Sequence, residues 1–400
     1  MKKITYLICT LFILSCAKEP KTNFEIPVLL ERSEKMQYFN EWSEVRTSYS
    51  DLKHLLTKNP DHIDALIRIT NLFIAEARIT GEHGHYYPAA LKTIEQALQQ
   101  KNINKDQEFL ALSAKASVQL SLHHFKDALK TAEIAQQKNP YNALIYGALI
   151  DAHVELGDYK NAVSLADKMV SMRPDLRSYS RVSYLREIYG MPEDAIKAMQ
   201  MAVEAGSPGS EEKAWAALQL AQLCIRYNKT AEGISILNQI LEERPDYPFA
   251  KANLATVYMS QGKFKEAEQE LKEACAIIPE VSFYIHLAEL YKQTKQQEAF
   301  DKLLPEILDM LTDDTQHGHN MSLEFAAVYS ELLNDPDKAL NYIQEDLNMR
   351  PENIDINRSL ANIYLLKKDK EMAANFLLKA NSTNSKNPEL LELNQRLQKI

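Results

Sequence analysis

Apolar and polar residues follow a helical period through most of the chain, and the stretch Asp246–Pro279 shows the pattern best. Its apolar positions are Leu254, Ala255 and Tyr258 in the first half and Phe264, Ala267, Leu271 and Ala274 in the second. The spacing predicts two short amphipathic helices, each with one apolar face. Gly262 allows the chain to reverse between them, and Pro279 ends the unit because proline cannot donate a backbone hydrogen bond inside a helix.

The same unit recurs along the chain with a period near 34 residues. Pro245 and Pro279 are 34 positions apart, and so are Pro140 and Pro174. The pattern LA..Y...GKF.EA...L..A....P resembles the tetratricopeptide repeat (TPR), a helix–turn–helix unit of that length. This resemblance implies an all-α, right-handed superhelical solenoid of TPR-like helix hairpins, with nine or ten hairpins and a C-terminal cap.

Four places depart from the regular repeat. The first unit, Leu30–Pro60, keeps only part of the pattern, and the second contains a long predicted insertion, RITGEHGHYYP. Gly206–Ser210 is a Gly/Pro/Ser cluster that predicts a long loop or hinge, and Pro305 predicts a kink in a helix. We therefore expect an N-terminal sub-array at residues 28–206, a C-terminal sub-array at 211–386 and a capping helix at 387–400.

The N-terminus has the features of an export signal. Two lysines precede an apolar run that is too short to span a bilayer, which predicts a signal peptide at residues 1–15. Ile13-Leu14-Ser15-Cys16 resembles the lipobox of bacterial lipoproteins, although Leu14 is bulkier than the residue usual there. The resemblance implies a lipidated Cys16, a polar tether at residues 16–27 and a place in the bacterial cell envelope, at the outer membrane. An ordinary secretory signal cut nearby is the alternative.

Charge and motifs narrow the classes of function. The formal net charge is −9 and no basic stripe is present, which argues against nucleic acid as a partner. The sequence lacks the G-x-S-x-G, H-E-x-x-H and P-loop motifs, and we expect no enzymatic activity. Cys224 and Cys275 fall on apolar helix faces, which predicts two small buried side chains rather than a disulfide or metal pair.

The first helix of each TPR hairpin lines the concave surface of the superhelix, so residues that alternate with packing positions are candidates for binding. The strongest candidates are Asn71, Tyr189, Arg226, Lys292, Arg358 and Asn362. Their mixture of amide, aromatic and basic groups suits a protein or peptide segment. Arg358 and Asn362 match half of the carboxylate clamp found in some TPR domains. An ordinary solvated surface is the competing interpretation.

The tripeptide His-Gly-His occurs twice, as His83-Gly84-His85 and as His317-Gly318-His319. Neutral imidazoles bind divalent transition metals, and Asp313 and Asp314 lie just before the second tripeptide. However, the first tripeptide is predicted in a turn within a hairpin and the second in a turn between hairpins. These turns lie on opposite edges of the ribbon and about seven hairpins apart, so only a tightly closed superhelix would bring them together. The competing interpretation is that each histidine caps or packs a long loop. His123-His124 is predicted to lie on the surface.

The function predicted from the sequence is a non-enzymatic envelope adaptor, attached to the membrane only by its lipid, that holds a protein or peptide in its groove. No cofactor is expected for it. The alternative is a metal-binding envelope protein that uses the His-Gly-His loops. A weaker alternative is nutrient capture, for which the chain has no large non-repeat lobe.

Overall fold

The computed structural model describes residues 24–399, and the predicted signal peptide and Cys16 lie outside this range. Within it the chain is all helical, with no strand. The α-helices are α1 (Glu41–Lys58), α2 (Ile63–Thr80), α3 (His83–Leu98), α4 (Lys105–Ser121), α5 (Phe125–Lys138), α6 (Leu144–Glu155), α7 (Tyr159–Met172), α8 (Leu176–Ile188), α9 (Pro192–Ala205), α10 (Glu211–Arg226), α11 (Thr230–Glu243), α12 (Pro248–Ser260), α13 (Phe264–Ile277), α14 (Val281–Gln293), α15 (Gln297–Gln316), α16 (Ser322–Ala327), α17 (Pro336–Met349), α18 (Ile354–Leu366), α19 (Lys370–Ala380) and α20 (Pro388–Lys399). Two short elements, η1 (Glu34–Met36, 3-10) and η2 (Val328–Leu332, π), complete the set.

The helices pair into antiparallel hairpins, as the repeat predicts. In α12–α13, Leu254, Ala255 and Leu271 are buried at the interface, and Gly262 makes the turn in the left-handed conformation (φ 72°). The hairpins between residues 63 and 380 run from α2–α3 to α18–α19, with α16 and η2 together forming the first helix of one of them. Helix α20 packs on α18 and α19 as the predicted cap. The prediction of an all-α solenoid of hairpins is confirmed.

The start of the described chain differs from the predicted first hairpin. Residues 24–33 form an extended segment that leads through η1 to a single helix, α1. The segment is fixed by Arg32, whose Nε and Nη2 donate to Glu76 at 2.8 and 2.6 Å, both groups being buried. Phe24 and Ile26 pack against the core beside α2 and α3, so packing begins within the range assigned to the tether.

The predicted insertion after α2 is in fact helix. Only Gly81 and Glu82 separate α2 from α3, and α3 then includes both histidines of the first His-Gly-His and Pro88. Gly, His and Pro are weak helix formers, which is why the pattern indicated a loop. Burial of Tyr86 and Tyr87, at 0 and 3% exposure, outweighs that local preference. Pro305 likewise lies inside a single helix, α15.

Cys224 is buried and Cys275 partly buried, and both are free thiols. None of the helices between residues 24 and 399 combines the length and apolar character needed to cross a bilayer.

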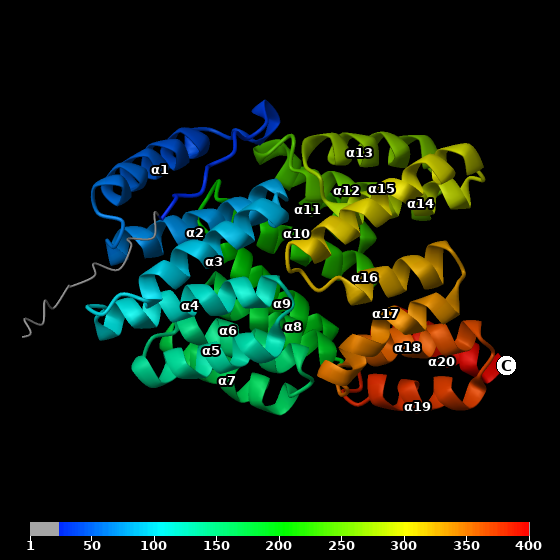
Figure 1. The fold of residues 1–400 in the computed structure, drawn as a ribbon. Helices are drawn as coiled ribbons and strands as arrows, with labels where there is room; N and C mark the ends of the chain where they lie inside the picture. Colours follow the sequence, from blue (N-terminus) through cyan, green and yellow to red (C-terminus); the bar gives the residue numbers. More distant parts are fainter. Residues whose placement is uncertain (1–23, 400) are drawn as a thin grey trace, which may run out of the picture.

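The hairpins stack into a ribbon that winds through more than one superhelical turn (Figure 1). Helices α1 to α7, blue to green, lie in the left half of the view, and α12 to α20, green to red, lie in the right half. In such a ribbon the turns within hairpins follow one edge and the loops between hairpins follow the other. The turns within hairpins of one superhelical turn therefore lie beside the loops between hairpins of the next superhelical turn. In this structure these two edges are in contact.

Candidate functional site

Polar pairs connect the first helices of neighbouring hairpins along the inner face of the superhelix. Arg181 on α8 donates to both carboxylate oxygens of Asp151 on α6, at 2.8 and 2.5 Å. Gln222 on α10 donates to Asn253 on α12 at 3.0 Å. Arg226 on α10 pairs with Glu187 on α8. These contacts hold inner-face side chains in fixed positions before any partner binds.

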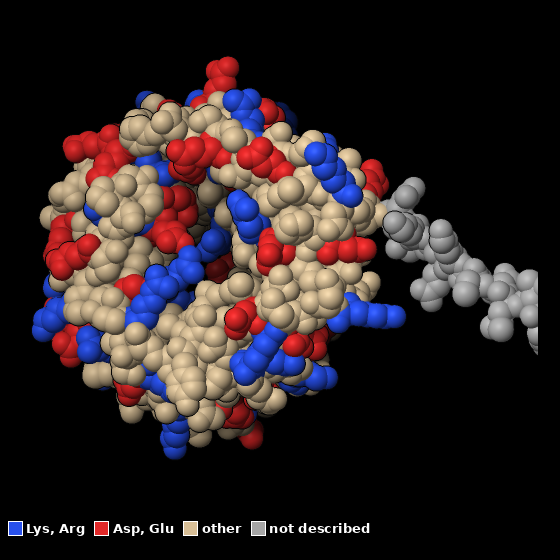
Figure 2. Space-filling model, turned by 90° about the vertical axis from the view of Figure 1, so that its left-hand side faces the viewer, with Lys and Arg blue, Asp and Glu red and all other residues tan. Residues whose placement is uncertain are grey.

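Arg226 and Arg358, two of the predicted groove residues, line one cavity of about 210 Å³. The cavity lies where the two superhelical turns face each other, between α8 and α10 on one side and α18 and α20 on the other. Arg358 contacts Asp355 at 3.1 Å and Glu389 at 3.4 Å. Figure 2 shows the molecule hollowed at its centre, with basic and acidic side chains around the hollow.

The other predicted groove residues do not line this cavity. Lys292 donates to the carbonyls of Glu331 and Leu332 at 2.7 and 2.9 Å, and Asn362 accepts from Arg396 at 3.0 Å. Asn71 is exposed on α2, and its amide donates to the carbonyl of Ile67, one turn earlier in its own helix. Tyr189 packs against the core of the first superhelical turn.

The two superhelical turns meet along a line of contacts that we call the seam. It joins the hairpin turns at Gly81, His123, Gly157 and Gly190 to the loops at Ile278, Asn320, Glu352 and Asn384, in that order. A Cβ at Gly81 would lie 3.7 Å from Ile278, and His123 Nδ1 lies 2.8 Å from the Asn320 carbonyl oxygen. The partners are 194 to 197 positions apart in the sequence, so the register of the seam changes by no more than three residues along its length. Sequence reasoning missed the seam altogether.

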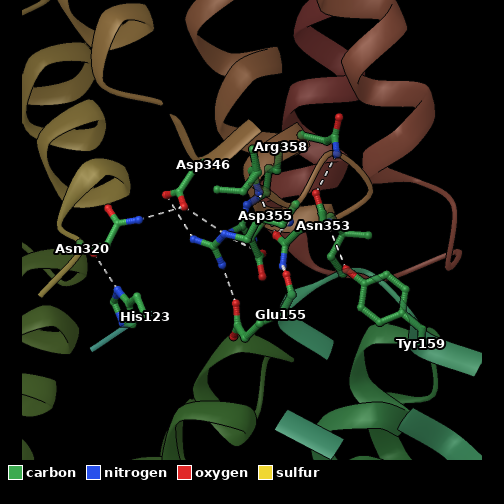
Figure 3. A network of polar contacts seen from close by, with 12 residues as sticks. His123, Glu155, Tyr159, Asn320, Asp346, Asn353, Asp355 and Arg358 are labelled. Atoms are coloured by element: carbon green, nitrogen blue, oxygen red, sulfur yellow. Dashed lines mark hydrogen bonds and ion pairs between the residues drawn. The ribbon is translucent and has the colours of Figure 1, made fainter. Parts of the chain in front are cut away.

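The middle of the seam is polar and buried (Figure 3). Arg350 Nη1 donates to Glu155 Oε2 at 2.5 Å, and its Nε and Nη2 donate to Asp346 at 3.1 and 3.2 Å. The Tyr159 hydroxyl accepts from the Ile354 N–H at 2.8 Å, and the Asn353 amide donates to the Glu155 carbonyl at 2.9 Å. Neighbouring hairpins of the second turn are thus bonded directly to α6 and α7 of the first.

Closure of the superhelix brings the two His-Gly-His tripeptides together, contrary to the expectation that their edges stay apart. The rings of His83 and His319 have centroids 6.1 Å apart. Donor atoms of His83, Asp314 and His319 all lie within 4.8 Å of one another. The physical reason is the seam. The turn before α3, where the first tripeptide begins, lies against the loop after α15, which holds the second tripeptide and belongs to the next superhelical turn.

The four histidines predicted as metal ligands nevertheless do not form a single cluster. His85 faces the N-terminal segment, with Nε2 2.8 Å from the Val28 carbonyl oxygen. His317 is exposed and its Nδ1 lies 2.8 Å from the Asp313 carbonyl oxygen in its own helix end. Asp314, noted from the sequence only as a neighbour of the second tripeptide, contributes a donor atom to this cluster, and the ring of His123, predicted to lie on the surface, packs against His319.

His319 lies at the centre of this cluster. The ring of His123 touches it edge to face, with centroids 4.5 Å apart. Burial, followed by the nearby His123, His83 and His124, lowers the pKa of His319 to about 3. The imidazole is therefore neutral near pH 7, the form that has a lone pair for a ligand.

Two stretches of the chain match models of the tetratricopeptide repeat, residues 113–176 and residues 227–280. The prediction of TPR repeats is confirmed there. No curated protein sequence matches the chain.

Several solved structures are similar. The Cut9–Hcn1 hetero-tetramer of the APC/C has a TM-score of 0.48 at 13% identity, over 90% of this chain and 60% of that chain. An IFIT1 monomeric mutant with Gppp-AAAA has a TM-score of 0.47 at 12% identity, over 92% of this chain and 91% of that one. TTC0263, a thermophilic TPR protein in Thermus thermophilus, has a TM-score of 0.43 at 19% identity, over 49% of this chain and 99% of that one.

Proposed function

We propose that this chain of TPR hairpins is a non-enzymatic scaffold that holds a segment of a partner protein on the inner face of its superhelix. The observation that carries the proposal is the cavity between the two superhelical turns, where Arg226 and Arg358 lie among polar and apolar walls. TPR hairpins are generally scaffolds for protein partners, and the inner-face pairs give this surface a fixed shape.

The side chains that line the cavity indicate which kind of peptide it binds. Glu389, whose side chain is 75% exposed, sits at the edge of the cavity and contacts Arg358. A carboxylate of a partner can replace it on the guanidinium, since Arg pairs with carboxylates through two parallel N–H donors. The phenol ring of Tyr184 and the side chain of Ile188 offer an apolar surface beside it. We therefore propose a peptide segment with an acidic residue next to an apolar one.

We further propose that Cys16 is lipidated and holds the scaffold at the outer membrane. The support is the lipobox resemblance alone. Metabolic labelling with a fatty acid tests it, because Cys16→Ser must then lose both the label and recovery in the membrane fraction.

Site-specific photo-crosslinking in the intact envelope tests the binding surface. A photoreactive residue at Tyr184 is expected to trap a discrete partner, and Arg358→Ala is expected to reduce the yield at least fivefold, about 1 kcal/mol of binding free energy. The matched control is the same residue at Tyr141, which is 87% exposed and lies outside this cavity. Equal adducts at both positions, or adducts at Tyr184 that ignore Arg358→Ala, would contradict the proposal.

A further inference from the structure

The histidine cluster at the seam combines groups from both superhelical turns. His83 is the first residue of α3, whereas Asp314 lies on α15 and His319 lies in the loop before α16. His83 and Asp314 are 231 positions apart in the sequence. Anything that binds all three side chains therefore joins the first superhelical turn to the second.

His319 supplies an independent sign of a missing ligand. Both of its ring nitrogens are buried, and neither has a hydrogen-bond partner among the described residues. Leaving a buried polar atom without a partner is unfavourable, so such atoms usually face a water or an ion. In a neutral ring one of these nitrogens carries a lone pair, and a donor atom of His319 lies within 4.8 Å of donor atoms of another imidazole and a carboxylate, which points to a ligand with positive charge.

The neighbouring side chains hold the rings in place. The ring of His83 is stacked on Tyr87, with centroids 5.4 Å apart. His123 Nδ1 lies at hydrogen-bonding distance from the Asn320 carbonyl oxygen, which assigns its proton to Nδ1 and leaves Nε2 with the lone pair. Supporting contacts of this kind are what orient histidine ligands in metal sites.

We propose that His83, Asp314 and His319 bind one divalent transition-metal ion of the zinc class, which fastens the two superhelical turns together. Two imidazoles and one carboxylate suit zinc and its neighbours, whereas calcium and magnesium prefer oxygen ligands throughout. Ligand atoms of tetrahedral zinc are ~3.4 Å apart, so donors within 4.8 Å close onto the ion by small side-chain movements. The fourth position is left to water.

Zinc titration of the untagged full chain, purified in detergent and treated with a chelator, tests the site. We expect saturable binding of one Zn²⁺ per chain, and visible absorption bands of tetrahedral geometry when Co²⁺ replaces it. His83→Ala and His319→Ala are each expected to weaken binding at least tenfold. Asp314→Asn, which keeps the shape of the side chain, covers the case in which a histidine variant fails to fold.

The two tripeptides provide matched controls. His85→Ala and His317→Ala remove the other histidine of each tripeptide and are expected to change the affinity less than twofold. Zinc is also expected to slow hydrogen exchange at residues 81–85 and 317–322 in the wild type and in both controls, but not in His319→Ala.

Absence of saturable zinc binding would contradict the proposed site. An equal loss of zinc affinity in the control variants and the ligand variants would also contradict it. Zinc binding that leaves exchange at the seam unchanged would overturn its fastening role. No partner protein is present in these measurements, so their outcome is separate from that of the crosslinking at Tyr184.

Discussion

Gly157 is constrained twice, by its own turn and by the seam. Its φ is 82°, and a Cβ would lie 2.6 Å from the backbone carbon of Glu352. Gly262 has a φ of 72° in the equivalent turn of another hairpin, with nothing within 4 Å of a Cβ. The two glycines therefore separate the cost of the conformation from the cost of crowding the seam.

We expect Gly262→Ala to lower the free energy of unfolding by about 1–2 kcal/mol, the cost of the left-handed conformation. Gly157→Ala is expected to lower it by about 1–3 kcal/mol more, because the new methyl group forces the two backbones apart. Urea unfolding followed by circular dichroism measures both. If both variants lost the same free energy of unfolding, the seam at Gly157 would accommodate the added methyl group without cost.

Among the elements, the helix formed by α16 and η2 is irregular and carries a buried acid, Glu324. Its Oε2 is buried without a hydrogen-bond partner among the described residues. Burial raises the pKa of Glu324 above its ordinary value of 4.5, with His123 opposing the shift. The folded protein thus keeps a proton that the unfolded chain releases.

Folding stability is therefore expected to fall as the pH rises from 4.5 to the raised pKa of the folded state, by at most about 1.4 kcal/mol per pH unit. Glu324→Gln is expected to remove this pH dependence, so the stability of the variant relative to the wild type increases as the pH rises. Unfolding curves at pH 4.5, 5.5, 6.5 and 7.5 measure it. Glu298→Gln, at a side chain 88% exposed, is the control and should follow the wild type. A wild type that parallels Glu324→Gln at every pH would refute the assignment.

Most hairpins could be predicted from the sequence, because their apolar period and turn residues are local signals. The first His-Gly-His could not, since its helix depends on burial of Tyr86 and Tyr87 against distant residues. The sequence predicted only part of the cavity, namely Arg226 and Arg358. Its repeat pattern could not distinguish these residues from Tyr189, which packs against the core.

For the whole molecule, the seam depends on a few buried hydrogen bonds, and Tyr159 makes one of them. We expect Tyr159→Phe to lower the free energy of unfolding by about 1–3 kcal/mol, because the buried N–H of Ile354 loses its acceptor. Hydrogen exchange should rise on both sides of the seam, near residues 155–160 and 353–357.

Tyr146→Phe is the matched control. The Tyr146 hydroxyl donates to the Pro140 carbonyl at 2.7 Å, only six positions away. Its loss should raise exchange locally and leave residues 353–357 protected. If exchange at those residues were the same in Tyr159→Phe as in Tyr146→Phe, the seam would not depend on this bond.

Three Arg-Pro pairs were the sequence signal closest to the seam. Arg173, Arg244 and Arg350 each precede a proline that separates two hairpins. The Arg173 side chain is 73% exposed, whereas those of Arg244 and Arg350 are 2% and 5% exposed. The two buried arginines face an earlier superhelical turn and Arg173 does not. That difference depends on how tightly the ribbon winds, which is the sum of small rotations between hairpins and has no local signature.

The long separation in sequence across the seam also has a consequence for synthesis of the chain. The seam partner of Tyr159 is Ile354, which leaves the ribosome 195 residues later, on the order of 10–40 s at typical elongation rates. Throughout that interval the first superhelical turn must persist with one edge uncovered. An apolar edge would invite aggregation, but Glu155, Tyr159 and His123 present charge and hydrogen-bonding groups there. The polar character of the seam is therefore compatible with an edge that is exposed to solvent until the second superhelical turn has been synthesised.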